Sequence, residues 1–160
     1  MVLIFMNYEI VKGKKENLKE CCEILIDSEI GRIYFAEKNI TRIINNALES
    51  EEIYVAINEY GKCLGFIWYA IEGAFQKFPY LHVIILEKSL RGMGIGKELI
   101  NYFEKIICEK YEKVFLMVGD FNHRAKKLYE ELGYKEIGVI PDFYKDGYNE
   151  HLMMKNKKYF

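Results

Sequence analysis

Three glycines at alternate positions, in the run Arg-Gly-Met-Gly-Ile-Gly at residues 91–96, constrain the fold of this chain more than any other feature. An apolar run at residues 81–86 precedes them, and apolar residues at helical spacing follow: Ile95, Leu99, Ile100, Phe103, Ile106 and Ile107. This pattern predicts a strand, a glycine turn and an amphipathic helix. Because glycine has no Cβ and the first N–H groups of a helix lack partners within it, the turn is suited to bind a phosphate group.

Neither of the common nucleotide-binding motifs fits this turn. A P-loop needs a glycine where the chain has Arg91 and a hydroxyl where it has Glu98, and the dinucleotide fingerprint needs a third glycine at Lys97. The spacing Arg-x-x-Gly-x-Gly does fit, and in it the chain resembles the GNAT superfamily of acetyl-CoA-dependent N-acetyltransferases. The alternative is a tight glycine turn that binds no ligand.

A second segment, residues 122–134, resembles the other cofactor motif of the superfamily, Asn-x-x-Ala-x-x-x-Tyr-x-x-x-Gly-Phe, with Tyr134 in place of the usual phenylalanine. Asn122 is predicted to cap the helix of this segment, and Gly133 to end it in a left-handed conformation. Taken alone, Tyr129 would be a core tyrosine. Together with the glycine turn, the segment identifies the chain as a member of the superfamily.

Length and composition predict a single domain over residues 1–160, large enough to bury a core of its own. No apolar run approaches the roughly 18 residues of a membrane span, and residues 1–6 lack the basic leader of a signal peptide. The four cysteines show no Cys-x-x-Cys spacing and lie in apolar patterns. We therefore expect reduced, mostly buried thiols and a cytoplasmic protein that does not associate with membranes.

Charge and histidine content argue against two further classes of protein. A net charge of −1 with interspersed lysine and glutamate gives no electrostatic basis for binding nucleic acid. The three histidines are not paired at ligand spacing, which argues against a metal site. The basic residues near the C-terminus are expected to form a solvated end: Lys155, Lys157 and Lys158.

The order of the expected elements matches the GNAT fold, an α/β (α+β) fold whose mixed central sheet of about seven strands carries helices on both faces. The expected strands are residues 8–11, 53–57, 63–71, a strand that ends at 86, 114–118, 134–139 and 148–154. The expected helices are residues 14–28, 37–48, a cofactor helix that runs to about 110, and the helix that follows Asn122. The resemblance implies that the fourth and fifth strands splay apart.

The resemblance also implies how acetyl-CoA binds. The pantetheine arm would bond to free backbone groups of the fourth strand, at the positions of Ile84, Ile85 and Leu86. The glycine turn with its neighbours and the asparagine of the second motif supply the other cofactor-binding positions: Arg91, Gly92, Met93, Gly94, Ile95, Gly96, Lys97 and Asn122.

The reaction of the superfamily, direct attack of an amine on the acetyl thioester, needs an acid and a base. Tyr129 holds the position of the acid that protonates the leaving thiolate, although a packing role is the alternative. His82 matches a histidine of the aralkylamine branch, in the pattern His-x-His-x-x-x-Val, with Tyr80 in place of the first histidine. An imidazole with a pKa near ~6.5 suits a base at neutral pH. A structural histidine, Glu72 as the base, or a chain of waters are the alternatives.

The acceptor is expected to be a primary amine of a small molecule or peptide, bound by a monomer or a homodimer. Aromatic residues crowd the loops that would flank the site, at residues 33–36, 73–80 and 141–147, which favours an amine with an apolar body. One alternative is an acyl-CoA-binding regulatory module without turnover. The other is an N-terminal protein acetyltransferase, although Met117 stands where that branch often carries a glutamate.

Overall fold

The computed structural model describes residues 7–159, so residues 1–6, for which the sequence predicts no signal peptide, lie outside the described residues. Contacts between Cα atoms divide the chain into two compact units. The first unit comprises the described residues up to Trp68 together with Ile84–Ile100. The second comprises Tyr69–Val83 and the described residues from Asn101 onward.

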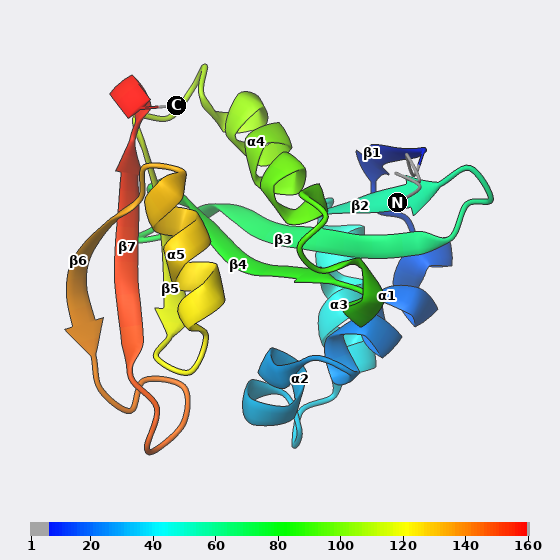
Figure 1. Cartoon of the computed structure of the whole chain (residues 1–160), viewed down its shortest axis with the longest axis horizontal. Helices are drawn as coiled ribbons and strands as arrows, with labels where there is room; N and C mark the ends of the chain where they lie inside the picture. The colour runs from blue at the N-terminus through cyan, green and yellow to red at the C-terminus, as the bar shows by residue number, and fades with distance from the viewer. Residues whose placement is uncertain (1–6, 160) are drawn as a thin grey trace, which may run out of the picture. The chain divides into compact units, whose positions relative to one another are not determined.

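The first unit combines strands with α-helices and short 3-10 helices. Its strands are β1 (Tyr8–Lys12), β2 (Ile53–Asn58), the first part of β3 (Cys63–Ala74) and the last part of β4 (Phe78–Leu86). Its helices are η1 (Lys15–Asn17), α1 (Leu18–Ile26), α2 (Glu29–Tyr34), α3 (Ile40–Glu49), η2 (Lys88–Leu90) and the start of α4 (Ile95–Ile107). Helices α1 and α3 pack against each other (Figure 1). Helix α1 buries Cys21, Cys22 and Leu25.

Helix α2 was not expected. The sequence predicted one helix over residues 14–28 and a connection through Tyr34, whereas α1 ends at Ile26 and α2 begins at Glu29. Ser28 separates the two helices, because its Oγ accepts a hydrogen bond of 2.9 Å from the Gly31 N–H and so caps α2. A Cβ on Gly31 would lie 1.8 Å from the carbonyl oxygen of Leu25, so the glycine allows the two helices to approach this closely.

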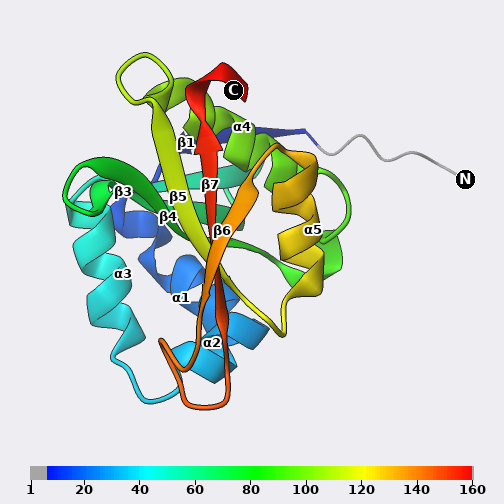
Figure 2. The same ribbon diagram turned by 90° about the vertical axis from the view of Figure 1, so that its left-hand side faces the viewer.

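The second unit contains the second motif. Its elements are the last part of β3, the first part of β4, the end of α4, β5 (Lys113–Gly119), α5 (His123–Glu131), β6 (Lys135–Ile140), β7 (Glu150–Asn156) and η3 (Lys157–Tyr159). Strand β7 pairs with β5 along its whole length and with β6 on its other side (Figure 2). Residues 73–80 were expected to form a loop, but β3 continues to Ala74 and β4 begins at Phe78. The turn between these strands holds Phe75 and Gln76 at φ values of +55° and +54°.

The strands form a seven-stranded sheet in the order β1-β2-β3-β4-β5-β7-β6. It is mixed, because β4 and β5 pair in parallel whereas β1–β2, β2–β3, β5–β7 and β6–β7 are antiparallel. The parallel pairing covers only two register positions, Tyr80 with Phe115 and Leu81 with Leu116. This order confirms the expected fold class, a mixed sheet of seven strands with helices.

The prediction that Lys155 belongs to a solvated C-terminal end is wrong, because the residue is buried. It lies on β7, opposite Val114 of β5, and is 4% exposed. Its Nζ lies 2.6 Å from Oε2 of Glu104 on α4, which is also buried. The cause is strand alternation, since Met153 and Lys155 both point to the buried side of β7 while Met154 between them is only partly buried.

The prediction for the cysteines is confirmed: all four are free thiols, and Cys21, Cys22 and Cys63 are buried. Within residues 7–159, no helix combines the length and apolar character needed to cross a membrane.

Candidate active site

The glycine turn lies in the first unit, between β4 and α4. Gly92 and Gly94 adopt φ values of +86° and +88°, in the left-handed region that favours glycine. A Cβ added to Gly94 would have no atom within 4 Å, so the space above this residue is open. A Cβ on Gly96 would lie 3.7 Å from Cδ1 of Leu86 and 3.9 Å from Cδ1 of Ile84. The glycine turn therefore sits beside the end of β4, so the predicted phosphate-binding turn lies next to the strand residues predicted to bind the pantetheine arm.

The start of α4 offers backbone donors. The Glu98 N–H donates to the Gly94 carbonyl oxygen at 3.1 Å, which makes it the first amide bonded within this helix. The amides of Ile95, Gly96 and Lys97 precede it, at the end of the helix that carries partial positive charge. The open space at Gly94 and these donors fit a phosphate group.

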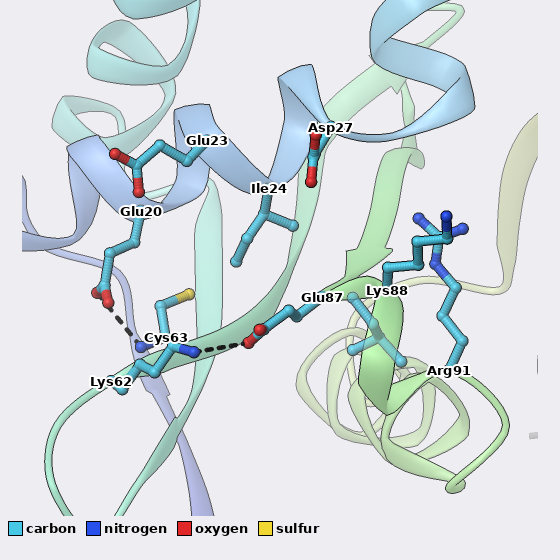
Figure 3. A pocket seen from close by; sticks show the side chains of 10 residues that line it. Glu20, Glu23, Ile24, Asp27, Lys62, Cys63, Glu87, Lys88 and Arg91 are labelled. Carbon is cyan, nitrogen blue, oxygen red and sulfur yellow. Dashed lines mark hydrogen bonds and ion pairs between the residues drawn. The ribbon is translucent and has the colours of Figure 1, made fainter.

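A cavity of about 200 Å³ opens in the first unit next to this turn. Arg91 and Lys88 line it from the segment after β4, and Glu23 of α1 and Asp27, which directly follows that helix, line it from another side (Figure 3). The complete lining is Glu20, Glu23, Ile24, Asp27, Lys62, Cys63, Leu86, Glu87, Lys88 and Arg91. The positive charge of Lys62 is paired with Glu87, since the Lys62 Nζ lies 3.0 Å from a carboxylate oxygen of Glu87. The Arg91 side chain thus lies among charges of both signs.

The second motif is built as its sequence predicts. Asn122 caps α5, because its Oδ1 accepts a hydrogen bond of 3.2 Å from the Ala125 N–H, and Gly133 follows the helix with φ at +92°. Tyr129 is 6% exposed, and its burial raises the pKa of the phenol. The phenol therefore stays protonated at neutral pH and is available as a donor.

His82 lies in the second unit on β4, on the same side of the strand as Tyr80, whose ring centroid is 4.8 Å away in a T-shaped contact. Part of the His82 surface is exposed to solvent. Protein atoms that surround the imidazole nevertheless exclude much of the water from around the ring. This desolvation lowers the pKa of His82 from 6.5 to about 4. The ring is neutral at pH 7 and can accept a proton, but it is a weaker base than the sequence led us to expect.

Tyr80 connects β4 to the loop before β7, which spans residues 141–149. Its hydroxyl lies 3.1 Å from that of Tyr144, and its own side chain is buried in a cluster with Ala74 and Phe115. Burial, the Tyr144 hydroxyl and the Glu150 carboxylate, in that order, raise the pKa of Tyr80. Burial and Glu150 also raise the pKa of Tyr144.

The aromatic residues expected around the acceptor divide into two groups. Phe78 and Tyr80 belong to the apolar cluster of the second unit, and the ring centroid of Phe78 lies 5.5 Å from that of Phe115. Phe143 and Tyr144 are 49% and 45% exposed and contact each other with centroids 4.6 Å apart. The second group therefore presents aromatic surface to solvent, and so does Phe75 in the turn between β3 and β4, which is 73% exposed.

Two further positions considered for the base are Met117 and Glu72. Met117 is half-buried on β5, opposite Leu152, so a thioether occupies the position at which a carboxylate would serve as base. Glu72 is exposed on β3. Among the described residues, no group of three or more His, Cys, Asp and Glu side chains is placed to hold a metal ion.

Sequence reasoning missed two buried acids, Glu150 at the start of β7 and Glu104 on α4, which are 1% and 6% exposed. Neither stands in a motif. The predicted strand over residues 148–154 contains Glu150, but alternation along it places Glu150 on the face opposite Met153 and Lys155, so the pattern did not mark this acid as buried.

The glycine turn, the capped α5 and the seven-stranded mixed sheet define an acetyl-CoA-dependent N-acetyltransferase of the GNAT class. The chain belongs to the Acetyltransferase (GNAT) family, which matches residues 18–134. An N-alpha-acetyltransferase of Sulfurisphaera tokodaii is 32% identical over 91% of this chain and 95% of its own.

Two solved structures have the same fold. Ard1 from Thermoplasma volcanium superposes with a TM-score of 0.78 at 19% identity, over 93% of this chain and 97% of its own. Spermidine N-acetyltransferase from Vibrio cholerae, solved in complex with CoA and spermine, gives a TM-score of 0.75 at 16% identity, over 94% and 96% of the two chains.

Proposed function

We propose that this enzyme transfers the acetyl group of acetyl-CoA to the α-amino group of a peptide or protein. The observation that carries the proposal is the relationship to an N-alpha-acetyltransferase over 91% of the chain. The chemistry of the candidate base supports it independently. A cytoplasmic location and a monomeric or dimeric state remain predictions from the sequence.

Acetyl-CoA supplies an acetyl group activated as a thioester. On this proposal the backbone of Ile84, Ile85 and Leu86 binds the pantetheine arm. The amides of the glycine turn and the first turn of α4 bind the pyrophosphate. The residues of the two motifs that we propose for cofactor binding are Arg91, Gly92, Met93, Gly94, Ile95, Gly96, Lys97 and Asn122.

Tyr129 is the proposed general acid. A leaving thiolate, comparable to a cysteine with a pKa of about 8.5, takes up a proton as it departs. Burial keeps the Tyr129 phenol protonated at neutral pH, so the donor is in the required state before the reaction.

His82 is the proposed base, and its lowered pKa bears on the choice of acceptor. A base with a pKa of about 4 removes a proton poorly from an alkyl ammonium ion. An alkyl amine with a pKa of about 10.4 is neutral in roughly one molecule in 2,500 at pH 7, whereas an α-amine with a pKa of about 8 is neutral in about one in ten. A weak base at this position therefore favours an α-amine, which needs less help to lose its proton.

The loop before β7 is the proposed contact for the acceptor chain. Phe143 and Tyr144 present exposed aromatic surface on it, and the bond from Tyr144 to Tyr80 ties it to the strand that carries His82. The same surface would suit a small amine with an apolar body, which is the second candidate acceptor.

Release of CoA thiol distinguishes the candidates. The purified enzyme and acetyl-CoA are mixed with a short peptide that has a free N-terminus and no lysine. A matched peptide has a blocked N-terminus and one lysine, and a third sample contains small primary amines. We expect turnover with the first peptide and an acetyl group on its terminal nitrogen by mass spectrometry. Turnover with the small amines alone would contradict the proposal and support the second candidate.

A further inference from the structure

A buried ion pair in the second unit is connected to Tyr129 through a single aromatic ring. Lys155 and Glu104 are 4% and 6% exposed, with Nζ and Oε2 only 2.6 Å apart. The same Nζ lies 5.6 Å from the centroid of the Tyr134 ring, within the range of a cation–π interaction. The Tyr134 ring in turn makes a T-shaped contact with Tyr129, with centroids 5.7 Å apart and an interplanar angle of 62°.

Tyr134 and Tyr129 are also joined through the backbone. The Tyr134 N–H donates to the Tyr129 carbonyl oxygen at 3.0 Å, across the left-handed Gly133 that ends α5. The position of one tyrosine is therefore coupled to that of the other. The backbone bond leaves the two side chains free to rotate, and the T-shaped contact between the Tyr134 and Tyr129 rings restricts that rotation.

Stability alone is a poor explanation for this arrangement. Within the described part of the chain, Glu104, Lys155 and the Tyr134 hydroxyl place two charges and a polar group in the core. Burial and the nearby Glu104 carboxylate raise the pKa of Tyr134, so its phenol is neutral. Burying charges and polar groups costs free energy that apolar side chains of similar size would not. What the ion pair does provide is a fixed geometry, because separating the charges in the core is costly.

We propose that Glu104 and Lys155 are positioning residues that hold the Tyr134 ring, and that this ring holds the Tyr129 phenol at the orientation required for proton donation. The inference rests on the proposed role of Tyr129 as the acid. A proton donor must be held to within about 0.5 Å and 10–20° of its working geometry by the side chains around it. Tyr134 is an aromatic neighbour in direct contact with Tyr129.

A double-mutant cycle tests the inference. Glu104→Leu combined with Lys155→Met replaces the ion pair with apolar side chains of similar length, which protein cores often tolerate without loss of stability. We expect kcat to fall about tenfold in the wild-type background and less than about twofold in the Tyr129→Phe background. Acetyl-CoA affinity and the acceptor KM should stay the same, since the ion pair touches neither proposed binding surface.

Lys126→Met is the matched control. Lys126 lies on α5, the same helix as Tyr129, but its ion pair with Glu136 at 2.8 Å is partly exposed, with the two side chains 25% and 35% accessible to solvent. The identical substitution there should leave kcat unchanged. If the paired variant does not fold, Glu104→Gln keeps the shape of the side chain and allows the same comparison between backgrounds.

The outcomes separate the inference from the proposed function. Equal losses of kcat in both backgrounds, or no loss in the wild-type background, would overturn the positioning role while leaving Tyr129 as the acid. A Tyr129→Phe enzyme with a normal kcat would overturn the acid assignment and the inference with it.

Discussion

The hydroxyl groups of Tyr80 and Tyr144 lie 3.1 Å apart and join the strand that carries His82 to the loop before β7. Tyr80 is 8% exposed and fixed in an apolar cluster, whereas Tyr144 is 45% exposed on the loop. The buried member of the pair therefore anchors the exposed one. An acceptor that binds at the loop, as proposed, would meet an aromatic surface that this hydrogen bond helps to hold in place.

Loss of that hydrogen bond should weaken acceptor binding. Tyr80→Phe and Tyr144→Phe each keep the ring, and we expect each to raise the acceptor KM by about 2- to 13-fold, the range of a hydrogen bond of about 0.5–1.5 kcal/mol. The double variant should do little more than either single one, since both remove the same bond. Steady-state kinetics with the free-N-terminus peptide measures the change. Tyr60→Phe, at a residue that is 85% exposed in the other unit, is the control. Additive effects of the two substitutions would show that the tyrosines act separately.

The glycine turn makes a prediction about acetyl-CoA affinity. Gly94→Glu places bulk and negative charge where the phosphate groups are proposed to bind, so calorimetry should detect no binding. Both this variant and the control Gly61→Glu place a side chain at positive φ, with φ at +88° and +77° and no atom within 4 Å of the added Cβ. Each should lose about 1–2 kcal/mol of stability from the left-handed backbone. Full acetyl-CoA affinity in Gly94→Glu would remove the turn from the cofactor site.

Features that depend on short stretches of sequence could be predicted. The cap at Asn122 and the left-handed Gly133 follow from residues next to one another in the chain, and so does the turn before α4. Their conformations are set by local sterics and local hydrogen bonds. The order of the seven strands followed from the same motifs, because the resemblance that they carry specifies the whole fold.

Features that depend on distant residues could not be predicted. Lys155 reads as part of a basic tail, and only pairing of β7 with β5 and the presence of Glu104, 51 residues earlier, make it a buried cation. The break between α1 and α2 depends on the close approach of Gly31 to Leu25. The pKa of His82 depends on protein atoms that no local pattern reveals.

Removal of the proposed acid should affect the chemical step alone. Tyr129→Phe keeps the contact with Tyr134 and deletes the hydroxyl, so we expect kcat to fall on the order of 10²-fold. Acetyl-CoA affinity should change little, because the proposed cradle lies on other residues. The measurement is single-turnover acetyl transfer at saturating peptide, where product release does not limit the rate. An unchanged rate would leave Tyr129 with a packing role.

The pH dependence of the reaction tests His82, and the structure changes what should be seen. An unperturbed imidazole would give kcat/KM an acidic limb near pH 6.5, but the pKa of His82 is lowered to about 4. Over the neutral range His82 is already deprotonated, so the rise of kcat/KM there should follow the α-amine of the peptide, with a pKa of about 8. A second limb near pH 4 should be present in the wild type and absent in His82→Gln, which should also be slower at neutral pH. His123→Gln, at an exposed histidine on α5, is the control and should change neither feature.

The same lowered pKa has a consequence for stability that does not depend on catalysis. A histidine whose folded pKa lies below its unfolded value of 6.5 binds fewer protons in the folded state, so protonation favours unfolding. The wild type should therefore lose stability as the pH falls from about 6.5 towards 4, and His82→Gln should lose less over that window. Urea unfolding at several pH values between 4 and 7 measures the difference. Parallel curves for the two proteins would mean that His82 is not desolvated. In that case its acidic limb should return to about pH 6.5, and the argument for an α-amine would rest on the relatives alone.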